Sequence, residues 1–327
     1  MKKEPTYRKA LSHAWRVVRY HPSLWVFGLF SLFLGQMGLL DFFTSISMAE
    51  KKYELYPLLF DLPELWNVFL EFLGSIQLSA DGWIWLVWLV LFFISAWVFF
   101  LFISVTSQGA LISGISQSLK RGKFHHVKID KAWHAGLTHF WRLLGLNALK
   151  KCILGLLATS IGFATYNVFV SYSAIDGIVF VLLFLLATIV GMILSLLVIY
   201  AAGYVVIEEY SFTKSIEAAW KLFLDHWLVS LEVGLMVLLL NVAIVLAAIV
   251  LVVLFVIEMG LVFVLSTIVS SLVIWKIGLF ISTLLLIVLF AIIGSLFSVY
   301  VTSVWTYLFL KMHKTGLKSR VFHFLGM

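Results

Sequence analysis

Charge is scarce in this sequence. Only 12% of the 327 residues are charged, 63% are apolar, and the mean hydropathy is +1.09. Soluble proteins contain about 25% charged residues and carry most of them on the surface. The shortage of charge therefore excludes soluble enzymes, nucleic-acid-binding proteins and disordered chains. The composition predicts a polytopic integral membrane protein.

Cysteine and proline are scarce as well. The single cysteine, Cys152, excludes an intramolecular disulfide and a cysteine-based metal cluster. It lies in an apolar run, where we expect it to be a small buried residue. All four prolines lie at or before Pro63. The later apolar runs therefore lack the proline breaks that secondary transporters often place near their binding sites.

Residues for catalysis are missing from the apolar runs. No Asp lies in the interior of a predicted membrane span and no His lies deep within one. Neither the H-E-x-x-H zinc motif nor the G-x-x-x-x-G-K-[ST] phosphate loop occurs. We therefore expect no enzymatic activity, with no catalytic residue, metal or cofactor.

Six stretches are long and apolar enough to be membrane spans, which need about 20 residues to cross roughly 30 Å of hydrocarbon. They are Leu24–Leu40, which reaches an acceptable length when extended to Phe43, Trp83–Ser107, Cys152–Ser171, Ile178–Val206, Val233–Ile257 and Ile277–Tyr300. A further stretch, Leu261–Trp275, is too short to span unaided. We expect it to form a re-entrant or interfacial helix on the outer side.

The basic residues predict an orientation. With six spans, 20 of the 23 Lys and Arg residues lie on one side, and only Lys51, Lys52 and Lys276 lie on the other. Cytoplasmic loops are enriched in Lys and Arg, so we expect both termini in the cytoplasm and the chain in the cell (cytoplasmic) membrane. The formal net charge of +7 then indicates anionic lipid headgroups as partners, and not nucleic acid.

A short pattern, Ala-Trp followed by five residues and His, occurs three times, before the first, third and fifth spans. Its marker residues are Trp15 and His21, Trp133 and His139, and Trp220 and His226. Each copy has one apolar and one polar face, which predicts an amphipathic helix in the cytoplasmic interface with Trp at headgroup depth. The His falls where the chain turns into the membrane and could bond the helix carbonyls freed there. A three-histidine metal site is the alternative.

These observations predict an all-α integral membrane protein with six transmembrane helices arranged as three hairpins. A cytoplasmic interfacial amphipathic helix precedes each hairpin, and the short outer helix near 261–275 is additional. We expect one membrane domain, 1–327, with repeat-like units 1–120, 121–210 and 211–327.

Four polar side chains in or near the spans are candidates for an intramembrane site: Gln36, Asn147, Glu232 and Asn241. A charged group at the centre of a span costs roughly 2.5–3.5 kcal/mol on insertion scales, which makes such residues functional candidates. Hydrogen bonding between helices is the structural alternative. Together the four could line the polar cavity of a small permease, although parallel units argue against the inverted repeats of many transporters.

Three segments carry a resemblance to known proteins: Ala14-Trp15 through Trp25–Phe30, Gly109–Ile112 through Phe140–Asn147, and Ala219–Phe223. Through them the chain resembles a group of uncharacterised prokaryotic six-span membrane proteins, similar to the membrane domain attached to some glycerophosphoryl diester phosphodiesterases. In the fused proteins a separate soluble, metal-dependent domain carries the activity, so no catalytic residue carries over. The resemblance implies a membrane domain that organises lipid or a protein partner. We expect a non-catalytic scaffold or lipid-interacting protein, with the small permease as the alternative.

Overall fold

The computed structural model describes residues 6–34, 80–120, 127–171 and 173–315. Within these ranges the chain is helical, without strands, which confirms the all-α expectation. The helices are α1 (Thr6–Tyr20), α2 (Ser23–Leu32), α6 (Ala80–Lys120), α7 (Ile129–Thr138), α8 (Phe140–Ser171), α9 (Ala174–Ile207), α10 (Phe212–Asp225), α11 (Trp227–Ile268) and α12 (Leu272–Thr315).

Among the described residues, five helices are long and apolar enough to cross a membrane. These segments are Gly82–Leu119, Phe140–Val170, Ala174–Ile207, Trp227–Ile268 and Leu272–His313. They overlap the expected second to sixth spans and extend beyond them. The expected first span begins in α2, which has only 10 residues, and the rest of that span lies outside the described residues. The chain is a multi-pass, all-α membrane protein.

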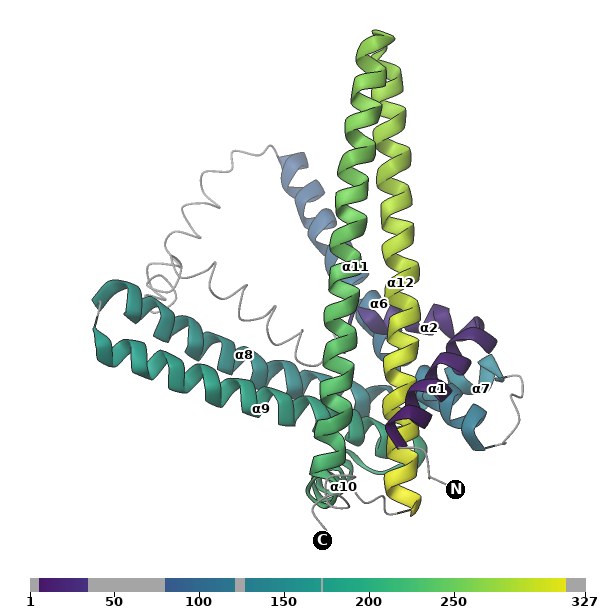
Figure 1. The fold of residues 1–327 in the computed structure, drawn as a ribbon, viewed down its shortest axis with the longest axis vertical. Coiled ribbons are helices and arrows are strands. Elements are labelled where there is room, and N and C mark those ends of the chain that lie inside the picture. Colours follow the sequence, from purple (N-terminus) through teal and green to yellow (C-terminus); the bar gives the residue numbers. More distant parts are fainter. Residues whose placement is uncertain (1–5, 35–79, 121–126, 172, 316–327) are drawn as a thin grey trace.

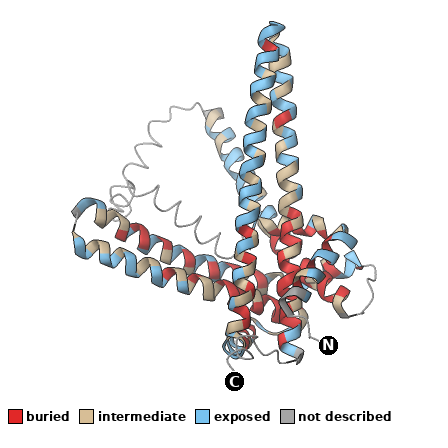
Figure 2. Ribbon diagram, viewed as in Figure 1, coloured by how far each residue is buried: buried red, intermediate tan, exposed pale blue. Residues whose placement is uncertain are grey.

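The long helices converge at one end of the molecule and diverge at the other (Figure 1). Buried residues concentrate where they converge (Figure 2). We call this region the hub; it consists of α1, α2, α7, α10 and residues 104–119, 143–150, 195–207, 229–241 and 295–312. The diverging parts are three arms: the rest of the α8–α9 hairpin, the rest of the α11–α12 hairpin and the first half of α6.

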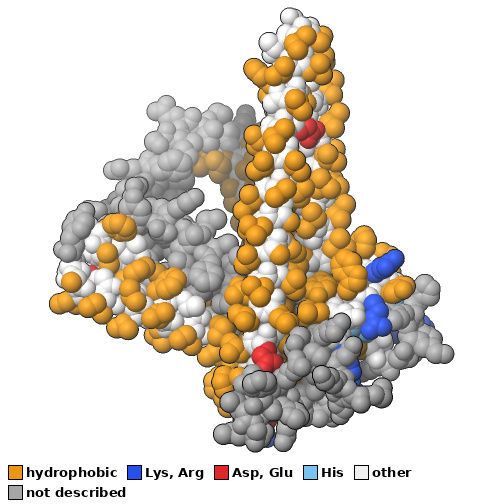
Figure 3. Space-filling model, viewed as in Figure 1, with side chains coloured by type: hydrophobic (Ala, Val, Ile, Leu, Met, Phe, Trp, Pro, Cys, Tyr) orange, Lys and Arg blue, Asp and Glu red, His pale blue; other side chains and the backbone are white. Residues whose placement is uncertain are grey.

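The arms expose apolar side chains. Figure 3 shows hydrophobic groups covering the visible face of the α11–α12 arm. Soluble proteins rarely expose a contiguous apolar patch larger than a few hundred Å², so lipid chains are the environment that suits the arms. Cys152 on α8 is exposed, and the expectation of a buried cysteine is wrong. An apolar thiol is as compatible with lipid as with a protein core.

The expected outer helix at 261–275 is also wrong, because these residues form the tip of the α11–α12 hairpin. α11 continues to Ile268 and α12 begins at Leu272. Ser270 has a positive φ of 51°; its N–H donates to the Thr267 carbonyl at 3.1 Å, and the next N–H donates to the Ser266 carbonyl at 3.0 Å. This pair of bonds is the Schellman ending of a helix, and it reverses the chain within three residues.

Glycines allow close helix contacts in the hub. A Cβ atom at Gly136 of α7 would overlap the Thr106 carbonyl oxygen of α6. A Cβ atom at Gly28 of α2 would lie 2.6 Å from the Ser295 carbonyl oxygen of α12. The backbones of α7 and α2 therefore lie directly against the long helices α6 and α12. The contact between α2 and α12 also contains a pair of hydroxyl groups, because the Oγ atoms of Ser31 and Ser298 lie 2.8 Å apart.

Candidate functional site

The three copies of the Ala-Trp-His pattern form three similar helix junctions. The alanines of the three copies, Ala14, Ala132 and Ala219, are completely buried. Each His follows at the end of its short helix: His21 comes directly after α1, and the other two are the C-caps of α7 and α10. The pattern therefore marks the points at which α1, α7 and α10 pass into α2, α8 and α11.

At two of the junctions the imidazole bonds a carbonyl in the last turn of the short helix. The Nδ1 atom of His139 donates to the Ala135 carbonyl at 2.8 Å, and the Nδ1 atom of His226 donates to the Leu222 carbonyl at 3.3 Å. Both carbonyls also accept the backbone N–H of the same His, at 3.3 Å for Ala135 and at 3.1 Å for Leu222. The imidazole therefore adds a second bond to a carbonyl that already has a partner, whereas a bond to a carbonyl left free was expected from the sequence. His21 is buried as well.

The three tryptophans differ in their surroundings. Trp15 is 62% exposed and Trp220 is 45% exposed. Trp133 is half-buried and stacks on Phe27 of α2 with ring centroids 6.1 Å apart. Two of the tryptophans are therefore available to the surroundings of the protein, and the third packs α7 against α2.

The histidines do not come together as a metal site. In the part of the chain that the structure describes, no three His, Cys, Asp or Glu side chains are close enough to hold one ion. The three-histidine alternative therefore has no geometric support among these residues.

A cluster of buried polar side chains lies inside the hub, between α6, α8, α9 and α12. The Nδ2 group of Asn147 donates to Gln108 Oε1 at 2.7 Å and to the Leu143 carbonyl at 2.9 Å. Lys150, almost one turn further along α8, is only 6% exposed. These side chains line a cavity of about 40 Å³ together with Ser195, Thr302 and Thr306. Its described lining contains one cationic side chain and no carboxylate.

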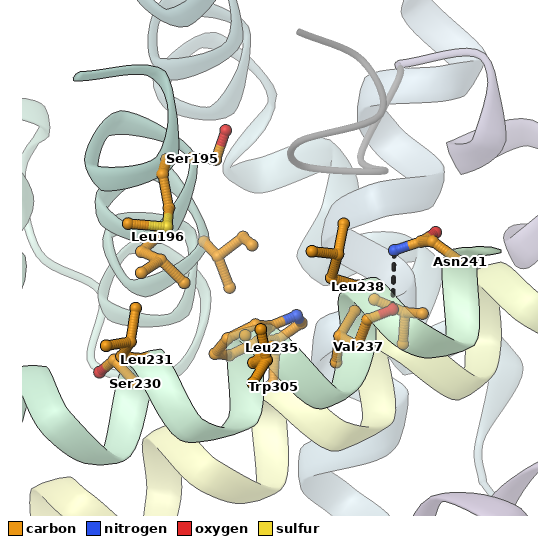
Figure 4. A pocket seen from close by; sticks show the side chains of 13 residues that line it. Ser195, Leu196, Ser230, Leu231, Leu235, Val237, Leu238, Asn241 and Trp305 are labelled. Carbon is orange, nitrogen blue, oxygen red and sulfur yellow. Dashed lines mark hydrogen bonds between the residues drawn. The ribbon is translucent and has the colours of Figure 1, made fainter. Parts of the chain in front are cut away.

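A second cavity, of about 120 Å³, lies between α9, α11 and α12 (Figure 4). It is mostly apolar, and Asn241 lies at one end, where its Nδ2 group donates to the Val237 carbonyl at 2.9 Å. The Asn241 Oδ1 and Ser195 Oγ atoms are buried without a hydrogen-bond partner, which costs about 1–3 kcal/mol for each group. Four residues line both cavities: Ser195, Ile199, Val301 and Trp305. The two spaces are therefore neighbours.

The structure brings two of the four expected polar residues into this region. Asn147 lines the smaller cavity and Asn241 the larger one. Glu232 is half-buried on α11 but lines neither cavity, and Gln36 lies outside the described residues. Of the three described residues, Asn147 and Asn241 therefore line neighbouring cavities and not one common cavity.

Sequence reasoning missed Lys150, Gln108 and Ser195. Lys150 and Lys151 look like an ordinary pair of cytoplasmic cations, but adjacent residues on a helix point about 100° apart. Lys151 is exposed, whereas Lys150 lies three residues after Asn147 and shares its face. This three-residue spacing was the signal in the sequence that could have identified Lys150.

Comparison of the chain with protein-family models, with curated proteins and with solved structures finds no match.

Proposed function

We propose that this chain is a non-catalytic membrane scaffold that binds lipid, located in the cell (cytoplasmic) membrane with both termini and the hub on the cytoplasmic side. The observation that carries the proposal is the grouping of α1, α7 and α10 in one hub from which apolar arms diverge (Figure 1). Amphipathic helices with exposed tryptophan and cationic side chains bind the interface of anionic membranes. The resemblance described above points in the same direction.

The cationic character is strongest on α1. Lys9, Arg16 and Arg19 are exposed on this helix, which contains no Asp or Glu. On α10, by contrast, Lys214 and Lys221 are offset by Glu217 and Asp225. We therefore expect α1 to contribute most of the preference for anionic lipid.

The test uses the full chain in nanodiscs made from equal amounts of phosphatidylglycerol and phosphatidylcholine. Native mass spectrometry then measures which lipid the protein retains after the nanodisc is removed. We expect enrichment of phosphatidylglycerol, because each Lys or Arg near an anionic surface contributes about 1 kcal/mol. Replacing Lys9, Arg16 and Arg19 by Gln should reduce the enrichment at least about fivefold. Lys276→Gln, near the tip of the α11–α12 arm, is the control, and equal retention of both lipids by the unmodified chain would contradict the proposal.

A small permease is the second candidate, and the buried Lys150 favours it. A buried ionisable group in a membrane protein is costly and commonly belongs to a substrate or ion pathway. The two neighbouring cavities place hydroxyl and amide groups beside it. If the chain is a permease for small anions, proteoliposomes should take up chloride or acetate faster than protein-free vesicles, and Lys150→Met should abolish the difference. Equal uptake rates with and without the protein would reject the permease and leave the scaffold as the only candidate function.

A further inference from the structure

An apolar groove lies between α1 and the foot of the α11–α12 arm. Its volume is about 320 Å³, within the range of about 300–1,000 Å³ that is usual for ligand pockets. The floor is built from aliphatic and aromatic side chains of two long helices, namely Leu240, Ile244, Ile293, Leu296 and Phe297. Trp15, Val18 and Tyr300 complete the lining. The described lining contains no charged side chain, so the groove itself suits a hydrocarbon chain.

The rim of the groove carries positive charge. Arg19 follows Trp15 by four residues, so both side chains lie on the same face of α1, and Arg19 is exposed. Figure 3 shows Lys and Arg side chains beside the foot of the α11–α12 arm, where Figure 1 places α1. A groove for a hydrocarbon chain therefore adjoins a cationic helix that has no acidic residue.

Trp15 and Tyr300 indicate how such a molecule would be oriented. Both line the groove, and both side chains combine an apolar ring with a polar group. Trp and Tyr are enriched at the level of lipid headgroups for this reason. A headgroup would lie near Trp15 and Arg19, and the chain attached to it would extend along the floor formed by α11 and α12.

We propose that this groove binds one acyl chain of an anionic phospholipid, with the phosphate of its headgroup held by Arg19. The inference rests on the proposed lipid-binding function and adds a defined site to it. Non-specific attraction to a charged surface needs only the cations of α1. A defined site also needs the shape of the groove, and the two requirements can be separated by mutation.

The experiment measures retention of phosphatidylglycerol by the full chain, by native mass spectrometry after extraction from mixed phosphatidylglycerol and phosphatidylcholine nanodiscs. Ile244→Trp fills the groove and should reduce the retained phosphatidylglycerol about tenfold. Leu246→Trp adds the same bulk to α11 at an exposed position and should leave retention unchanged. Arg19→Gln should reduce retention about fivefold, whereas Arg19→Lys should keep most of it. Soluble glycerol phosphate should not compete, because it lacks the acyl chain.

The outcomes separate the two proposals. If the unmodified chain enriches phosphatidylglycerol and Ile244→Trp retains as much as Leu246→Trp, the groove is not the site but the lipid-binding function stands. If the unmodified chain shows no enrichment, the lipid-binding function fails. Competition by glycerol phosphate would overturn the acyl-chain assignment. A dimer that survives lipid removal and is disrupted by Ile244→Trp would assign the groove to a second copy of the chain. Arg19 is at the surface, so its variants test the phosphate contact even if Ile244→Trp does not fold, and competition by glycerol phosphate against the unmodified chain then tests the acyl-chain assignment.

Discussion

His13 lies on the face of α1 that packs against α12. Its ring centroid is 5.3 Å from that of Tyr307. Burial lowers the pKa of His13 below its ordinary value of 6.5, and the positive charges of Arg16 and of protonated His21 lower this pKa further. The folded state therefore holds His13 neutral at a pH where the unfolded state already binds a proton. The contribution of neutral His13 to folding stability is fully present above about pH 6.5. It is lost as the pH falls from that value toward the lowered pKa.

The contact between α1 and α12 should consequently weaken in mild acid. Hydrogen–deuterium exchange of residues 6–20 should be faster at about pH 5.5 than at about pH 7.5, after correction for the intrinsic pH dependence of exchange. His13→Gln removes the titrating group and should make the corrected exchange rates at the two pH values equal. His134→Gln, at an exposed position on α7, should keep the difference. A difference that persists in His13→Gln would show that another group is responsible.

Asn147 and Gln108 offer a second test at the residue scale. Asn147→Leu leaves the buried Gln108 Oε1 atom without its 2.7 Å partner and should lower stability by about 1–2 kcal/mol. Gln108→Leu combined with Asn147→Leu removes both polar groups and should recover part of that loss. Thermal unfolding in detergent measures each variant. A double variant less stable than the single one would show that the amides contribute more than this one hydrogen bond.

Helix contacts in the hub depend on glycine at particular positions. Gly136→Ala would force the Cβ atom into the Thr106 carbonyl, so α7 must move away from α6, at a cost of about 1–3 kcal/mol. Gly155→Ala on α8 is the matched control, because nothing lies within 4 Å of its added Cβ atom, and the better helix propensity of Ala should raise stability by up to about 1 kcal/mol. Thermal unfolding in detergent compares the two. Equal midpoints would contradict the close α6–α7 contact.

The long helices could be predicted from the sequence because each is a continuous apolar run. A separate helix at 261–275 was predicted because the charged residues Glu258 and Lys276 were taken as the ends of a segment. Glu258 is instead satisfied inside the hairpin, where Ser282 Oγ donates to its Oε1 atom at 2.8 Å. That partner lies 24 residues away along the chain, so no local pattern reveals it.

The short helices could be predicted because their apolar and polar faces alternate with the period of a helix. The positions of their junction histidines follow from the same pattern, because each His comes directly after its short helix. Which long helix each short helix contacts could not be predicted. The contact of α7 with α6 depends on Gly136 meeting Thr106, and a glycine in an apolar sequence does not identify its neighbour.

At the scale of the whole molecule, charged side chains and closely packed residues both lie in the hub, whereas the arms carry few charged groups. α11 has 42 residues and is therefore about 63 Å long, roughly twice the hydrocarbon thickness of a bilayer. Its first part lies in the hub, and the remainder, residues 242–268, is about 40 Å long, which is enough to cross the hydrocarbon of a bilayer. With the hub on one side of the membrane, as proposed above, we expect the tip, with Lys276 near it, on the opposite side.

This arrangement predicts the accessibility of single cysteines. The background is Cys152→Ser, which removes the only native cysteine. Lys276→Cys, near the tip, should react with a membrane-impermeant maleimide added to intact cells. Lys221→Cys, exposed on α10 in the hub, should react only after the membrane is opened, because the cationic side is expected to face the cytoplasm. The reverse pattern would place the hub outside the cell. Labelling of both positions in intact cells would contradict a single orientation.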